Sequence, residues 1–471
     1  MYVGRLSAAD AWYLYLEGPT VHLHVTGLLL LDPSTAPDRF SFDSLRSFIE
    51  GRLHLMPVLR KRLVEVPMSI DHPTWIDDPD FDLDDHLHHR AMDGSASADD
   101  LAELVGEFAS TPLRRDQPLW DMVFVDGLEG DGVAVAMKMH HCIVDGVSGM
   151  EIMAELLDLE PSPAPRRPGV HDPPAPVPSR VEAAMAASWN RLTDPLRPVR
   201  AAIGAATSMV NLGESAMRRR LGGADAVAHP VNAPRTRFNA SIGPRRQVAF
   251  GLAPLEDLKA IRAAFGVTVN DVVLAACSYG LRQYLQTWDE LPDRPLVCSV
   301  PVSTHGHGGA PAANQVSNMF VNLPVDIADP VEQLLSIHRG SLGAKEVQES
   351  VGTHLISDII ELIPASLFQL TTRLYSVSGL ADRLAPVHNL IVSNVKGSPV
   401  PLYMAGARVT AMFPFGPLME GTGLNITVLS NNGEMNIGLI ACPELVPSLD
   451  ELLDGMIAGI AVLLEASRHT V

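Results

Sequence analysis

Two adjacent histidines, His140 and His141, stand where a strand-like apolar run ends and an Asp-Gly pair follows. The run 133–139 has the composition of a strand, and a segment of helical composition begins at Val147. A neutral imidazole has an unperturbed pKa near ~6.5, which suits it to take a proton from a hydroxyl group at cellular pH. The residue types and their position therefore indicate a general-base site.

The residues that follow the pair could hold it in place. Consecutive strand residues point to opposite faces, so only one of His140 and His141 can enter a cleft. Asp145 could orient that ring or fix the turn, and Gly146 allows a backbone angle or a close approach that a side chain would forbid. A metal site is the alternative, but adjacent strand histidines diverge and no third strong ligand lies nearby, so we expect none.

The spacing His-His-x-x-x-Asp-Gly also resembles the signature of the coenzyme A-dependent acyltransferase superfamily. That superfamily includes chloramphenicol acetyltransferase-like enzymes and the condensation domains of peptide synthetases. The signature indicates only the superfamily, so the family within it has to be inferred from motifs in the rest of the chain.

Length and composition set limits on the class of protein. A chain of 471 residues is too long for one ordinary core, so we expect two domains. The net charge of −20 argues against a nucleic-acid partner, whose binding site would be basic. The four cysteines are scattered, which predicts free thiols in a reducing, cytoplasmic compartment. No signal-peptide layout and no apolar run of about 18 residues is present, so we expect no membrane span.

Elements in the first half position the histidines. The turn 129–132 predicts a hairpin between a strand at 120–125 and the histidine strand. Pro118, Leu119 and Trp120 should then lie near the site, with core packing as their expected role. The other elements predicted here are a helix from Ser7 with Asp10 in a capping box, a strand over 21–31, a helix over 42–55 and a helix over 99–108.

Two histidine-rich stretches resemble metal sites at first sight. His22 and His24 share a face of their strand, where sheet packing is the more economical interpretation. The acids and histidines of 81–90 lack a spacing that would bring ligands together. We interpret that segment as a solvated strand and loop.

The composition changes after Leu159. The proline-rich stretch 161–178 predicts a stiff, extended connector. The following stretch, 180–220, is locally basic and rich in apolar residues, so it could be an amphipathic helix drawn to anionic lipid or an interdomain helix with a solvated face. We therefore predict an N-terminal domain at 1–160, a linker and helical stretch at 161–236, and a C-terminal domain at 237–471.

The second half alternates strands and helices. Asn270 and Asp271 are expected to cap a helix over 272–285, and Ser448 with Glu451 should cap the closing helix. Asn432-Gly433 predicts a tight turn between the last two strands. The other predicted elements are strands at 246–252, 295–301, 318–324, 390–395, 407–412 and 424–430, a helix at 255–265, and a helical zone from 330 to 380.

The ordered set of motifs resembles the bacterial wax ester synthase/diacylglycerol acyltransferase family, in the triacylglycerol synthase group abundant in actinobacteria. The set consists of Pro118-Leu119-Trp120, His140 through Gly146, Asn270-Asp271, Ser393-Asn394-Val395 and Gly423 through Ile426. The resemblance implies an α/β (α+β) fold of two chloramphenicol acetyltransferase-like domains. Each would be a mostly antiparallel or mixed sheet flanked by helices, with a tunnel between the domains.

The resemblance also implies roles for individual residues. His141 would be the proton acceptor, His140 would support it, Asp145 would fix the turn, and Asn270 could steady the reacting oxygen. The remaining motif residues would contact substrate or shape its pocket: Gly146, Pro118, Leu119, Trp120, Asp271, Ser393 and Asn394. The chain departs from the family pattern at Lys396-Gly-Ser-Pro399, at Asn431 and at Thr304-His305. These departures lie where acceptor contacts are expected, so the acceptor stays open.

The implied reaction is the transfer of a long-chain acyl group from acyl-CoA to a hydroxyl group. Diacylglycerol is the expected acceptor, and a long-chain alcohol is the alternative. A non-catalytic lipid-surface protein that keeps the fold is the alternative from another class. No cofactor is expected, and Cys142 should face away from His141, so transfer should be direct. Because such acceptors are apolar, we expect the protein in the cytoplasm or peripherally at the inner membrane or lipid bodies.

Overall fold

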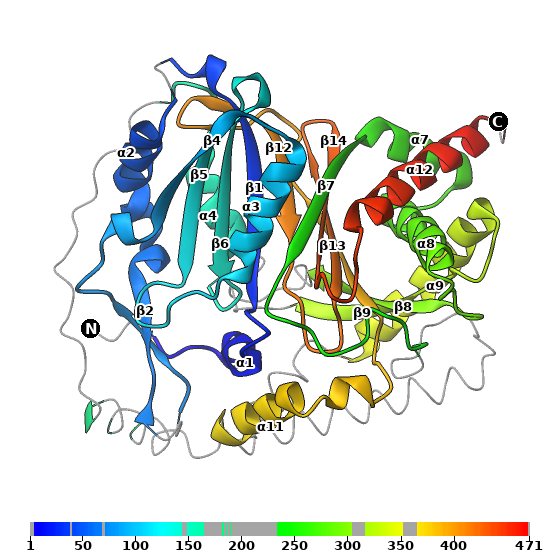
Figure 1. The fold of residues 1–471 in the computed structure, drawn as a ribbon, viewed down its shortest axis with the longest axis horizontal. Helices are drawn as coiled ribbons and strands as arrows, with labels where there is room; N and C mark the ends of the chain where they lie inside the picture. The colour runs from blue at the N-terminus through cyan, green and yellow to red at the C-terminus, as the bar shows by residue number, and fades with distance from the viewer. Residues whose placement is uncertain are drawn as a thin grey trace.

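The computed structural model describes residues 4–37, 40–67, 71–143, 148–163, 181–182, 185, 189, 233–303, 316–351 and 365–469. Two six-stranded mixed sheets stand side by side, with helices packed against them (Figure 1). The predicted fold class, two mixed sheets flanked by helices, is confirmed.

The first sheet holds the histidine strand in its interior, with a neighbour on each side. Its strands, in spatial order, are β11 (Tyr403–Met404), β12 (Ala407–Phe415), β1 (His24–Asp32), β6 (Val133–His140), β5 (Trp120–Leu128) and β4 (Leu87–Ala96). All neighbours are antiparallel except β4 and β5. The predicted hairpin between β5 and β6 is confirmed, and Gly130 in its turn has a φ of 70°.

The strand predicted from Val21 begins three residues later, at His24. Leu23 has a φ of 47°, a left-handed backbone angle that interrupts an extended strand. His22 and His24 are both buried, and their ring centroids lie 5.6 Å apart. Their ring nitrogens bond the main-chain oxygens of Pro244 and Ala109, so both histidines pack within the fold.

The second sheet is built from the C-terminal half alone. Its strands, in spatial order, are β7 (Gln247–Pro254), β14 (Glu434–Ala441), β13 (Leu424–Asn431), β10 (Leu390–Lys396), β8 (Leu296–Ser303) and β9 (Val316–Leu323). β10 runs parallel to both of its neighbours, and the other pairs are antiparallel. The predicted turn is confirmed, because Asn432 and Gly433 both have positive φ, as a type I′ turn requires.

The helices cover the sheets on several sides. They are α1 (Ala8–Leu16), α2 (Phe42–Arg52), α3 (Ala98–Ser110), α4 (Ser148–Leu156), α7 (Leu255–Phe265), α8 (Val269–Thr287), α9 (Pro330–Val351), α11 (Ala365–Val377) and α12 (Leu449–Arg468). In Figure 1, α7, α8, α9 and α12 gather beside the second sheet, whereas α11 runs below both sheets near α1. Within the described chain no helix alone meets the length and hydropathy of a membrane span. α7 and α8 meet them only as a pair bent by 103°.

Two local predictions need correction. Ser448 precedes α12 as expected, but its φ is 55° and its side chain makes no capping hydrogen bond to the helix. The stretch 81–90 is a loop and strand as predicted, but His86 is buried because its ring stacks on Trp120.

One apolar cluster joins the two sheets. Leu28 and Val125 of the first sheet pack in the same cluster as Val248 and Ile440 of the second. β11 and β12 also cross into the first sheet, although they lie far along the C-terminal half. The division at 1–160, 161–236 and 237–471 stays a prediction, and the basic stretch 180–220 lies outside the described residues except at 181, 182, 185 and 189.

Candidate active site

His140 ends β6 with both its backbone and its ring in defined hydrogen bonds. Its main-chain N–H donates to Leu119 O at 2.9 Å, and the N–H of Cys142 donates to its Nδ1 at 3.1 Å. An Nδ1 that accepts a hydrogen bond leaves the proton of the neutral ring on Nε2. That Nε2 lies 3.8 Å from Oε2 of Glu17, so the carboxylate faces the proton-bearing edge of the ring.

His140 is held neutral by its surroundings. The ring is fully buried, and burial is the main cause that keeps its pKa well below the usual value. The positive charge of the nearby Arg115 lowers that pKa further, because it disfavours a second positive charge beside it. His140 is therefore an uncharged, fixed support for the residue that follows it.

His141 is the accessible member of the pair. Its side chain is partly exposed, and its main-chain N–H donates to Leu23 O at 2.9 Å. The His141 ring stacks on Tyr13, with centroids 4.0 Å apart and planes 13° apart. Burial, and then the charge of Asp10, raise the pKa of Tyr13 to about 12, so its phenol stays neutral. His141 is thus oriented by a fixed aromatic face while part of it remains open.

Helix α1 belongs to this site, which the sequence reasoning missed. Asp10 and Tyr13 lie three residues apart on one side of the helix, and Glu17 is the C-cap residue that follows its last turn. Glu17 forms an ion pair with Arg115, and burial raises the pKa of the Glu17 carboxyl despite that partner. The helix itself was predicted, but no local signal tells which strand its polar side will meet.

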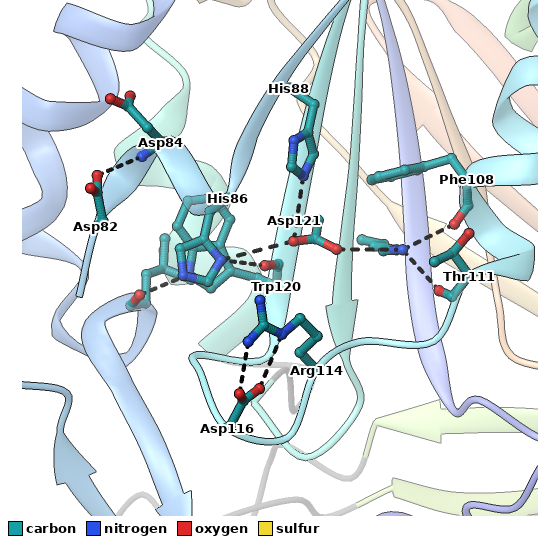
Figure 2. A network of polar contacts seen from close by, with 12 residues as sticks. Asp82, Asp84, His86, His88, Phe108, Thr111, Arg114, Asp116, Trp120 and Asp121 are labelled. Atoms are coloured by element: carbon teal, nitrogen blue, oxygen red, sulfur yellow. Dashed lines mark hydrogen bonds and ion pairs between the residues drawn. The ribbon is translucent and has the colours of Figure 1, made fainter. Parts of the chain in front are cut away.

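Pro118, Leu119 and Trp120 support the histidines from within the core. All three are buried, as expected for packing residues. The indole Nε1–H of Trp120 donates to Leu59 O at 2.7 Å. His86 stacks on that indole at 4.6 Å and bonds Trp120 O through its Nδ1 at 2.8 Å (Figure 2). Leu119, in turn, supplies the carbonyl oxygen that accepts from His140.

A buried lysine lies two residues before the pair. Lys138 Nζ donates to the main-chain oxygens of Phe108 and Thr111 and lies 3.4 Å from Asp121 (Figure 2). Burial, and then this lysine, lower the pKa of His24 to about 3. The imidazole that faces His140 across the β1–β6 ladder is therefore neutral as well.

Asn270 and Asp271 lie in a second group, at the start of α8 beside the second sheet. The expected cap is corrected here: Thr268 is the N-cap, and Asp271 completes a capping box with it. Asp271 also accepts from His338 Nδ1 at 2.8 Å. Asn394 on β10 donates from Nδ2 to Asn270 Oδ1 at 3.4 Å, which joins two motifs that are far apart in sequence.

The other predicted site residues are placed only in part. Ser393 is partly buried on β10, opposite Thr427 in the parallel ladder. Asp145 and Gly146 lie outside the described residues. Cys142 is buried, and burial raises its pKa well above the usual value, so its thiol stays protonated. The named residues thus form two groups, one on each sheet.

Comparisons with known proteins match both halves of the chain. Residues 6–273 match the family described as the wax ester synthase/diacylglycerol acyltransferase catalytic domain, and residues 312–463 match the WS/DGAT C-terminal domain. A protein of Mycobacterium tuberculosis H37Rv, provisionally named a diacylglycerol O-acyltransferase, is 37% identical over 470 residues. The match covers 98% of this chain and 90% of that protein. A second protein of Mycobacterium tuberculosis H37Rv, tgs2, is also provisionally named a diacylglycerol O-acyltransferase and is 31% identical over 449 residues. That match covers 94% of this chain and 95% of tgs2.

Solved structures show the same fold. The wax ester synthase/diacylglycerol acyltransferase from Marinobacter aquaeolei VT8 superposes with a TM-score of 0.68 at 26% identity. That match covers 98% of this chain and all of the other. The first condensation domain of the calcium-dependent antibiotic synthetase matches with a TM-score of 0.56 at 15% identity, covering 99% and 97% of the two chains.

Proposed function

Because the chain belongs to the wax ester synthase/diacylglycerol acyltransferase family, we propose that it transfers a long-chain acyl group from coenzyme A to the hydroxyl group of diacylglycerol. The observation that carries this proposal is the geometry of the histidine pair. His140 is buried and neutral, whereas His141 is partly exposed and stacked on Tyr13. The provisional names of the mycobacterial relatives favour diacylglycerol as the acceptor.

In the proposed reaction, His141 takes the proton of the acceptor hydroxyl group while the oxygen of that hydroxyl attacks the thioester carbonyl. An oxyanion forms and collapses, the C–S bond breaks, and the proton passes from His141 to the departing thiolate. The Asn270 amide is the candidate donor to that oxyanion, since its Oδ1 is already bonded to Asn394. The protonated, buried thiol of Cys142 favours direct transfer without an acyl-enzyme.

In the discriminating experiment, the purified protein is incubated with labelled palmitoyl-CoA and either dioleoylglycerol or hexadecanol. The products are then separated by chromatography. We expect labelled triacylglycerol as the main product. A wax ester as the main product would assign the alternative, a wax ester synthase. The absence of any acyl transfer would favour a non-catalytic lipid-surface protein and refute the proposal.

The same assay tests the base. His141→Ala should lose about 10²–10⁴-fold in rate, as expected when a general base is removed. His89→Ala is the matched control, because His89 is an exposed histidine paired with Asp126 on the edge of the same sheet. Full activity in His141→Ala would refute the assignment. His140→Ala should lower stability as well as activity, since that ring is fully buried.

A further inference from the structure

Helix α11 carries a row of exposed leucines along one side. Leu367, Leu370 and Leu374 are between 51% and 54% exposed. Their spacing of three and four residues places them within about 60° of one another around a helix that advances 100° per residue. An apolar row this exposed is unusual on a globular protein and indicates a contact surface.

The opposite side of the same helix is fixed to the protein. Phe368 packs against Trp12 of α1, with ring centroids 4.9 Å apart. Ser376 Oγ donates to Glu420 at 3.1 Å and lies 3.1 Å from the hydroxyl of Thr20, which follows α1. These contacts fix the inner side of α11, so the leucine row on its other side faces outward. Figure 1 shows α11 running close to α1.

More exposed apolar side chains follow the helix along the chain. Leu380, Leu384 and Val387 are also exposed, so 365–389 holds six of the sixteen exposed large hydrophobic side chains of the described residues. The segment contains two arginines, Arg373 and Arg383, and a single acid, against a net charge of −20 for the whole chain. That acid, Asp382, already accepts hydrogen bonds from Ser241. The segment 365–389, whose six exposed leucine and valine side chains we call its leucine face, is thus apolar and carries a net charge of +1 from its two arginines and one acid.

One helix separates the leucine face from the candidate base. The α1 helix that receives Phe368 through Trp12 also carries Tyr13, which stacks on His141. A lipid surface seated on α11 would lie next to the element that orients the base. Such a position is the one required by an enzyme whose acceptor does not dissolve in water.

We propose that the leucine face of 365–389 binds an anionic lipid surface, from which the acceptor reaches the site. This rests on the proposed function. Apolar side chains flanked by basic residues are the chemistry that binds a helix in the plane of such a surface. A second copy of the chain fits less well, because the centres of protein interfaces concentrate Trp, Tyr and Arg, whereas this row consists of leucines.

The test compares binding of the full-length protein to vesicles of phosphatidylcholine alone and of equal phosphatidylcholine and phosphatidylglycerol. The variant Leu367→Gln/Leu370→Gln/Leu374→Gln removes the apolar row but keeps good helix formers. The matched control, Leu252→Gln/Leu342→Gln/Val462→Gln, changes three large hydrophobic side chains that are exposed on other elements. Circular dichroism and thermal melting of both variants verify folding.

We expect the parent and the control to float with the anionic vesicles, and the α11 variant to bind more than about tenfold more weakly. Transfer to a water-soluble short-chain alcohol should stay unchanged in the α11 variant, whereas transfer to vesicle-borne diacylglycerol should fall. Equal vesicle binding by parent and variant would overturn the proposal. So would a parent that does not bind, or a parent dimer that the substitutions dissociate in sedimentation velocity. Vesicle binding does not require turnover. A protein that binds vesicles but transfers no acyl group would therefore refute the proposed function and leave the lipid-binding proposal standing.

Discussion

Tyr13 gives a direct test of whether α1 orients the base. The substitution Tyr13→Leu keeps an apolar side chain of moderate size and removes the aromatic face on which His141 lies. The rings are nearly parallel, with centroids 4.0 Å apart, so the stacking contact is lost completely. The expected consequence is a His141 ring that samples more orientations than the productive one.

The magnitude follows from the stacking energy. An aromatic pair contributes about 0.5–1.5 kcal/mol beyond the area that it buries. If all of this orients His141, then kcat should fall by about two- to twelve-fold, because 1.36 kcal/mol corresponds to a factor of ten in rate. The KM for acyl-CoA should change little, since the stack acts on the base. Steady-state kinetics on labelled palmitoyl-CoA and diacylglycerol measures both constants.

Tyr13→Phe is the matched control. It keeps the ring, and the phenol is neutral at working pH because its pKa is raised to about 12. We therefore expect near-parental kcat and an unchanged pH profile. Unaltered kcat in Tyr13→Leu would refute the orienting role. An equal loss in both variants would refute the stacking explanation and assign the effect to the hydroxyl group.

Three further predictions concern stability. Burial raises the pKa of Glu17, so the stability it contributes is present below its unfolded pKa and is lost as pH rises through the folded pKa. The melting temperature of Glu17→Gln relative to the parent should therefore increase from pH about 4 to about 7, and a decrease would contradict this. Arg52→Met should lower the free energy of unfolding in urea by roughly 3 kcal/mol or more, because it removes the guanidinium that lies 2.6 Å from the buried Asp158 carboxylate. The double variant Arg52→Met/Asp158→Leu should recover part of that loss. A chain ending after residue 400 should aggregate in size-exclusion chromatography, since it leaves the edge of β1 unpaired and removes β13 and β14 from the second sheet. A monodisperse product would argue otherwise.

Features encoded by a few neighbouring residues were predictable. Ser7 accepts from the Asp10 N–H and starts α1 as its spacing indicates. Asn432 and Gly433 adopt the turn that their small, flexible backbones favour. The Thr268 capping box is encoded in the same way, because Thr-x-x-Asp is a local pattern.

Features created by distant segments were not predictable from one sequence. Nothing near Glu17 indicates that it will face His140 or pair with Arg115. His86 lies among acidic residues and was expected in solvent, yet Trp120 covers it. In each case the partner lies more than thirty residues away, and chain topology alone brings the two together.

The crossing of β11 and β12 into the first sheet explains why both halves of the chain are needed to build the site. β1, which places His24 opposite His140, is paired on its other edge with β12 from the C-terminal half. The N–H of Met412 on β12 donates at 2.8 Å to the side chain of Asn436 on β14, which ties the first sheet to the second. Gly438 on β14 lets the strands approach there, because a Cβ would clash with the carbonyl of Pro414. The scaffold of the histidine pair and the sheet beside Asn270 are therefore parts of one connected framework, and a change in the packing of β12 on β14 would shift one group relative to the other.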